Sequence, residues 1–329
     1  MSCADRPPVP RPPVSALWAR RVRLSRLPGV LSLWLVMILA GGCDEDRQAM
    51  GRLEKVWGKV GISPGRFETP RAMTLGPEDE VYVVDKTGRI QVFDREGNYL
   101  RGWSTPQQRN GRPTGISIDR RGRVLVADTH YHRILIYSPH GDLLASIDKT
   151  RGNQLGQFDL VADVVEDSAG NYFVSEYGEN HRIQKFSPDW RPLVQWGGAG
   201  TEPGRFSRPQ CLALDEEENL WVADSGNHRI QVFDREGRLL KLWGREGRGP
   251  GELCYPYGLA LGPQQTIYVA ESGNNRVQKL TRDGESLGWW GSGGREPGEL
   301  SSPWAVALDS RGRLHVLDTY NHRVQTVKM

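Results

Sequence analysis

The pattern of apolar and polar positions repeats along most of the chain, with a period of 43 to 48 residues. The segment LWVADSGNHRIQVFDREG, which starts at Leu220, has copies that start at Val81, Val124, Tyr172, Ile267 and Leu314. An acidic residue holds the same place in all six copies, at successive spacings of 43, 48, 48, 47 and 47 residues. So regular a period indicates a repeat architecture.

Each copy contains four short apolar segments that are typical of β-strands. In the fourth copy these segments are Cys211–Leu214, Leu220–Ala223, Arg229–Phe233 and Leu239–Trp243. Turn sequences such as Asp-Glu-Glu-Glu-Asn and Ser-Gly-Asn-His separate them. The second and third segments are apolar on both faces, which favours burial between stacked sheets. The pattern predicts an all-β, six-bladed β-propeller of four-stranded antiparallel blades.

The two ends of the chain complement each other. The last copy stops at Met329 without a fourth strand, and Arg52–Trp57 resembles an outer strand that has no blade of its own. We expect this N-terminal strand to pair with residues 323–327 and so to close the last blade, which removes exposed sheet edges. Outer strands often end in an indole that can fill the gap between blades: Trp57, Trp103, Trp196, Trp243 and Trp290.

The repeated signature is D-x-x-N-H-R-(I/V)-Q, preceded by P-x-G-(L/I)-A-(L/V)-D. It resembles the NHL repeat, over residues 51–329. The resemblance implies a propeller, usually of six blades. Members of that family include binding platforms, RNA-binding domains, sensor domains of membrane receptors and a peptide-amidating lyase, so the resemblance implies the fold more closely than the function.

The N-terminal region reads as a targeting segment. An arginine-rich stretch, Arg20–Arg26, precedes an apolar run from Val30 to Ala40, and Gly41-Gly42-Cys43 follows. This order resembles the signal and lipobox of bacterial lipoproteins. It implies a leader over residues 1–42, lipidation of Cys43, a short linker over 43–50 and a propeller over 51–329, exported and anchored at a membrane of the cell envelope. The alternative is an uncleaved anchor, but a membrane span needs about 20 apolar residues and this run is shorter.

Charge and cysteine content narrow the picture. Six arginines and one aspartate give residues 1–42 a charge of +5, which leaves −2 for the rest of a chain whose net charge is +3. A body without excess positive charge argues against a nucleic-acid partner. Cys211 and Cys254 remain beyond the leader and Cys43. They either form a disulfide, which an exported compartment permits, or stay buried thiols, which we favour.

The Asn-His-Arg triplet of the repeat could be mistaken for a catalytic group. The histidine position is Asn275 in the fifth copy and is missing from the first, so it is typical of a turn and not of a titrating imidazole. We expect the arginine to form a fork with the acid four to six residues earlier and to brace the turn between strands two and three. The structural pairs are Asp85 with Arg89, Asp128 with Arg133, Glu176 with Arg182, Asp224 with Arg229, Glu271 with Arg276 and Asp318 with Arg323. The alternative is that these six acids ring a channel and hold Ca²⁺.

The residue that enters the first strand differs from blade to blade, although the framework positions repeat. These residues are Arg71, Thr114, Ala162, Gln210, Tyr257 and Trp304, and Asp163 departs from the repeat by placing an acid in a small-residue position. The long interblade loops and the turns between strands two and three share one face of a propeller. We therefore predict a ligand-binding mouth at Arg71, Thr114, Asp163, Gln210, Tyr257 and Trp304, suited to a peptide, a glycan or a small polar ligand. The alternative is that these side chains only fill a tapering channel.

No zinc-ligand spacing and no nucleophile or phosphate-binding motif occurs in the sequence. We therefore name no catalytic residue, metal site or cofactor, apart from the calcium alternative. The function that this sequence favours is a monomeric, membrane-anchored module that binds a protein, peptide or glycan. The alternative is a calcium- or zinc-dependent lyase or hydrolase on the same fold. The similar peptide-amidating lyase binds metal with histidines, whereas most histidines here lie in the framework turn.

Overall fold

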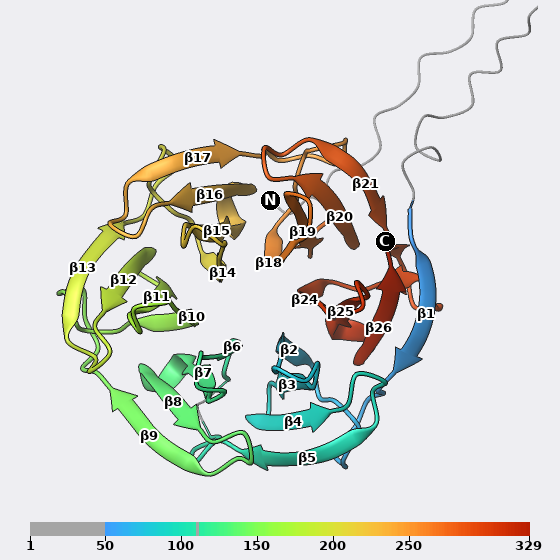
Figure 1. Cartoon of the computed structure of the whole chain (residues 1–329), viewed down its shortest axis with the longest axis horizontal. Coiled ribbons are helices and arrows are strands. Elements are labelled where there is room, and N and C mark those ends of the chain that lie inside the picture. Colours follow the sequence, from blue (N-terminus) through green and yellow to red (C-terminus); the bar gives the residue numbers. More distant parts are fainter. Residues whose placement is uncertain (1–49, 110–111) are drawn as a thin grey trace, which may run out of the picture.

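The computed structural model describes residues 50–109 and 112–329. Six four-stranded antiparallel sheets surround a central channel, as Figure 1 shows. The prediction of an all-β, six-bladed propeller is therefore confirmed. Within these residues, no helix is long and apolar enough to cross a membrane. The predicted leader and Cys43 lie outside the described residues.

The blades follow one another along the chain. The first two blades contain β2 (Pro70–Leu75), β3 (Val81–Asp85), β4 (Arg89–Phe93) and β5 (Tyr99–Ser104), then β6 (Gly115–Ile118), β7 (Val124–Asp128), β8 (Arg133–Tyr137) and β9 (Leu143–Asp148). The third and fourth contain β10 (Leu160–Glu166), β11 (Tyr172–Tyr177), β12 (Arg182–Phe186) and β13 (Pro192–Gly197), then β14 (Pro209–Leu214), β15 (Leu220–Asp224), β16 (Arg229–Phe233) and β17 (Leu239–Trp243). The fifth contains β18 (Pro256–Gly262), β19 (Thr266–Glu271), β20 (Arg276–Thr281) and β21 (Ser286–Trp290).

The first strand of each blade faces the channel and the fourth lies on the rim (Figure 1). The two middle strands are buried along their length, for example β15 and β16 in the fourth blade. Their apolar residues on both faces pack against the neighbouring sheets, which explains why these strands do not alternate in polarity.

The sixth blade contains strands from both ends of the chain. It consists of β24 (Pro303–Leu308), β25 (Leu314–Asp318), β26 (Arg323–Lys328) and the N-terminal β1 (Arg52–Trp57). Trp57 pairs with Val324 and Arg52 with Lys328, so the partner segment starts one residue later than predicted. The predicted closure is otherwise confirmed, and in Figure 1 β1 runs along the rim beside β26.

The rim indoles pack across the boundary between blades. The ring of Trp57, from the sixth blade, lies 4.7 Å from the ring of Phe93 in the first. A Cβ atom at Gly97 would approach the Trp57 ring to 2.4 Å, and Gly97 also has a positive φ of 77°. Three further glycine turns meet an indole in the same way: Gly141 at Trp103, Gly237 at Trp196 and Gly284 at Trp243. The indole therefore needs a glycine opposite it.

A buried acid–arginine pair occupies every blade. All six carboxylates are at most 1% exposed, and all six pairs expected from the sequence are in contact. In the fourth blade, Arg229 Nε donates to Asp224 Oδ2 at 2.7 Å. The same carboxylate accepts the backbone N–H of Ser207, in the loop that enters the blade, at 2.7 Å. The pair therefore fixes the loop as well as the turn between strands two and three.

Within the described residues, the preceding blade holds the other face of the interblade loop in five blades. The backbone N–H of Tyr255 donates to His228 Nδ1 at 3.1 Å, and that of Arg208 donates to His181 Nδ1 at 2.8 Å. In the fifth blade Asn275 Oδ1 accepts the N–H of Ser302 at 2.7 Å. This position also has left-handed backbone, with φ of 56° at His228 and 54° at Asn275. Because asparagine meets both requirements, it can replace histidine there.

The hydrogen bond that His228 accepts should make the stability of the fold depend on pH. Burial lowers the pKa of the His228 imidazole. A base whose folded pKa is depressed stabilises the fold above its unfolded pKa of about 6.5, and that stability is lost as the pH falls. We expect His228→Asn, which copies the fifth blade, to keep the acceptor but not to titrate. Denaturant unfolding should show that the variant loses less stability than the wild type between pH 7.5 and pH 5.5. An identical pH dependence in both proteins would contradict this role.

Candidate functional site

A β-bulge stands at the start of the inner strand in five blades. The pairing register shifts by one residue there, for example between Pro209 and Cys211 and between Pro256 and Gly258. The residues left out of register are Arg71, Ala162, Gln210, Tyr257 and Trp304. A bulge re-aims the extra side chain, and bulges are common beside functional sites. The variable position noticed in the sequence is therefore the bulge position.

All of these side chains except Ala162 line a cavity of about 220 Å³, which we call the mouth. It is lined by Arg71, Arg112, Thr114, His130, Tyr177, Arg208, Gln210, Tyr257 and Trp304. Five of the six predicted residues are thus brought together, and Asp163 is not among them. The sequence prediction missed Arg112, His130, Tyr177 and Arg208. They come from the interblade loops and from the turns between strands two and three, the two kinds of segment that were expected to share this face.

An aromatic wall forms one side of the mouth. The rings of Tyr257 and Trp304 lie 5.0 Å apart at an angle of 31°. The guanidinium of Arg71 lies over the Trp304 ring at 5.6 Å, within the range of a cation–π contact. Trp304 Nε1 donates to Ser302 Oγ at 3.1 Å, which fixes the orientation of the indole.

The mouth is cationic and contains polar groups without a partner. Three arginines and one histidine line it, and no aspartate or glutamate does. Within the described chain, Arg71 Nε and Gln210 Nε2 are buried and have no hydrogen-bond partner. Burial lowers the pKa of Arg71, and the nearby charge of Arg112 lowers it further. Burial also lowers the pKa of His130, so this imidazole is neutral at pH 7.

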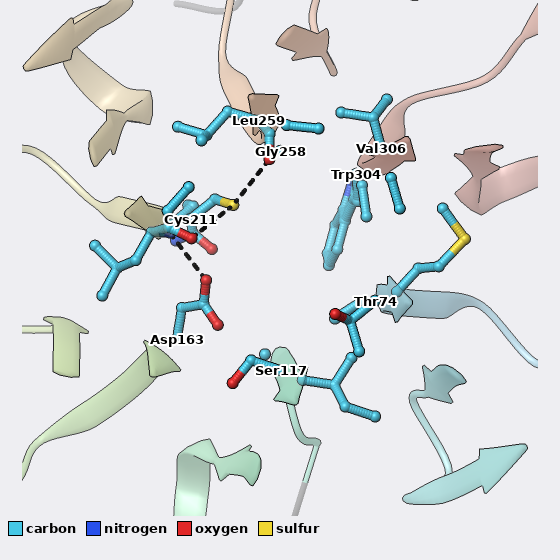
Figure 2. Close-up of a pocket in the computed structure, with 18 of the residues that line it drawn as sticks. Thr74, Ser117, Asp163, Cys211, Gly258, Leu259, Trp304 and Val306 are labelled. Atoms are coloured by element: carbon cyan, nitrogen blue, oxygen red, sulfur yellow. Dashed lines mark hydrogen bonds between the residues drawn. The ribbon is translucent and has the colours of Figure 1, made fainter. Parts of the chain in front are cut away.

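Below the mouth lies the central channel, a cavity of about 370 Å³ lined by the inner strands. The channel and the mouth share Arg71, Thr114, Gln210, Tyr257 and Trp304, so the two cavities adjoin. In Figure 2, Asp163 lies beside Cys211 across from Trp304. None of the six paired framework acids is among the lining residues. Calcium in the channel therefore stays a prediction that would require other ligands.

Asp163 joins two blades through backbone hydrogen bonds. Its Oδ2 accepts the N–H of Leu212 in the next blade at 2.9 Å, and its Oδ1 accepts the N–H of Val164 at 2.9 Å. Burial raises the pKa of the carboxyl to about 7. The departure from the repeat at this position thus has a structural explanation, because the side chain replaces a small residue with a link between β10 and β14.

The two cysteines of the propeller do not pair with each other, since Cys211 is a free thiol. Its Sγ lies 3.9 Å from the carbonyl oxygens of Leu212 and Leu259. Burial raises the pKa of this thiol. Among residues 50–109 and 112–329, no group of three His, Cys, Asp or Glu side chains could hold a metal ion.

A family model described as "NHL repeat" matches residues 110–137, 206–233, 253–280 and 300–326. The chain carries NHL repeats. This NHL propeller is 38% identical to the rat peptidylglycine alpha-amidating monooxygenase over 162 residues, which are 46% of this chain and 16% of that protein. It is 33% identical to the human NHL repeat-containing protein 3 over 163 residues, 43% of this chain and 44% of that protein. The chain thus spans less than half of either relative.

Solved structures share the fold of the NHL propeller at low sequence identity. A streptogramin B lyase superposes with a TM-score of 0.59 and 13% identity, covering 87% of this chain and 99% of the lyase. A putative gluconolactonase gives 0.60 and 16%, covering 81% of this chain and 90% of that protein. An auxiliary nutrient binding protein from Bacteroides thetaiotaomicron gives 0.60 and 13%, covering 79% of this chain and 69% of that protein. These likenesses show the fold alone.

Because Asp163 links two blades, the loss of stability caused by Asp163→Ala should depend on pH. An acid with a folded pKa of about 7 and an unfolded pKa of about 3.9 stabilises the fold when protonated, and that contribution is lost as the pH rises through this range. We expect the substitution to cost about 2 kcal/mol at pH 5, because it leaves the Leu212 N–H buried without an acceptor, and less at pH 8. Denaturant unfolding at both pH values checks this. A cost that grows towards pH 8 would contradict the assignment.

Proposed function

We propose that this NHL propeller is a binding module that holds a protein, peptide or glycan ligand at the mouth. The observation that carries the proposal is the gathering of four unlike side chains from the bulge position, Arg71, Gln210, Tyr257 and Trp304, around a single cavity. Framework positions repeat from blade to blade, whereas this position supplies a cation, an amide and two aromatic surfaces. Such convergence of a few polar groups with aromatic surface is typical of ligand sites.

Two buried donors support binding over simple filling of the channel. Arg71 Nε and Gln210 Nε2 lack acceptors in the described chain. A buried donor without a partner costs free energy, and a ligand that supplies acceptors removes that cost.

The proposal includes export and anchoring through Cys43, and the direction of β1 suits it. Trp57 pairs with Val324, next to the turn between β25 and β26, whereas Arg52 pairs with Lys328 at the far end of the sheet. The corresponding turn of the second blade supplies His130 to the mouth. The chain therefore joins the ring at the face opposite the mouth. An anchor on that side would leave the mouth pointing away from the membrane.

The alternative function, a metal-dependent lyase or hydrolase, has less support from the site. His181 and His228 accept backbone N–H groups between blades. They would have to give up these bonds to bind a metal ion. The activity in the name of the rat enzyme cannot be transferred to this chain, because the match covers only 16% of that enzyme.

Affinity capture tests the proposal. We expect the full chain to retain an envelope protein or glycan. The double variant Tyr257→Ala/Trp304→Ala should capture at least about tenfold less, because buried aromatic residues often carry much of the binding energy. Leu240→Ala, an exposed residue of the rim strand β17 that is 51% exposed, serves as the control and should behave as wild type. Equal capture by all three proteins would exclude the mouth. Stoichiometric zinc or calcium in the purified protein would favour the lyase or hydrolase.

A further inference from the structure

Arg71 differs from the framework arginines in having no carboxylate beside it. Each of the six framework arginines contacts an acid of its own blade. Arg71 forms no ion pair within the described chain, and its Nε is buried without an acceptor. It is partly buried and faces Arg112 across a cavity that contains no acidic side chain. A partly buried cation without a counter-ion favours an anionic ligand, and a guanidinium binds a carboxylate through two parallel hydrogen bonds.

The remaining lining of the mouth points to a hydroxylated ring. Every one of the nine lining side chains carries a hydrogen-bonding group, and none is aliphatic. Thr114, Tyr177 and Gln210 can therefore bind hydroxyl groups around the ligand. The mouth itself offers no aliphatic surface to the apolar side chain of a peptide, because the aliphatic residues lie in the adjoining channel.

The aromatic wall and the size of the cavity agree with a single ring. Tyr257 and Trp304 present a broad, partly buried surface on which the apolar face of a sugar can pack. The mouth encloses about 220 Å³, which is below the roughly 300–1,000 Å³ of sites for drug-sized ligands. One ring fills such a space, and the rest of a longer glycan would extend into solvent.

We propose that the mouth binds a uronic acid residue of an acidic glycan. The carboxylate accepts hydrogen bonds from Arg71 and Gln210, and the sugar ring packs on the wall formed by Tyr257 and Trp304. This inference rests on the proposed binding function of the mouth and names its ligand class. Arg112 and Arg208 add positive charge at the edge, which attracts a polyanionic chain.

Calorimetric titration of the full chain in detergent, at low salt, tests the inference with three probes. The probes are D-glucuronate, D-glucose as the neutral ring, and N-acetyl-phenylalaninate as a peptide-like acid. We expect saturable binding of glucuronate at least about tenfold tighter than that of glucose, and weaker binding at high salt. Arg71→Gln should remove the preference for glucuronate. Arg311→Gln, an exposed arginine at the opposite face, should keep it.

Three results would overturn the inference. They are equal affinity for glucuronate and glucose, tighter binding of N-acetyl-phenylalaninate, and no saturable binding of any probe. The capture experiment separates this failure from that of the proposed function. If Tyr257→Ala/Trp304→Ala still abolishes capture of an envelope ligand, the mouth remains a binding site and only the sugar-acid assignment falls.

Discussion

The buried carboxylate of each blade is the interaction on which the rest of the structure depends. Asp224 shows the arrangement: it receives hydrogen bonds from Arg229, Asn227, Gln231 and the backbone of Ser207. A buried charge is tolerated only when its partners are complete, and removing one partner costs several kcal/mol. Burial raises the pKa of Asp224 while these bonds oppose the rise. The group therefore stabilises the fold only while the loop and the two middle strands keep this arrangement.

This constraint separates the framework from the mouth. In the fourth blade, the interblade loop is held by the acid of its own blade at Ser207 and by the histidine of the preceding blade at Arg208. The bulge residue that follows, Gln210, takes no part in either contact. Its side chain can therefore change without disturbing the ring.

Much of this arrangement follows from the sequence, because the repeat supplies its own comparison. Blade number, strand order and ring closure could be predicted from six aligned copies, with the register of β1 displaced by one residue. The family model leaves out the copies at Val81 and Tyr172. Their turns differ in length, yet Asp85 and Glu176 still meet Arg89 and Arg182. These two copies can still be found by comparing the repeats with one another, because each keeps its acid and its arginine.

What escaped prediction depends on contacts between blades. The bulge that turns Trp304 towards the channel is a matter of strand register, which the spacing of residues does not reveal. Asp163 stood out in the sequence, but its partner, the backbone of Leu212, lies in another blade. Arg112 and Arg208 reach the mouth from loops whose path depends on the folded ring.

Thermal unfolding of two variants tests the separation of framework from mouth most directly. Asp224→Asn changes one framework acid without changing its size, and Arg71→Gln/Gln210→Ala changes two mouth residues. We expect Asp224→Asn to lower the Tm by about 6 °C or more, as a loss of about 3 kcal/mol would in a domain of this size. The mouth variant should stay within about 2 °C of the wild type. A larger fall in Tm for the mouth variant than for Asp224→Asn would contradict the separation of framework from mouth.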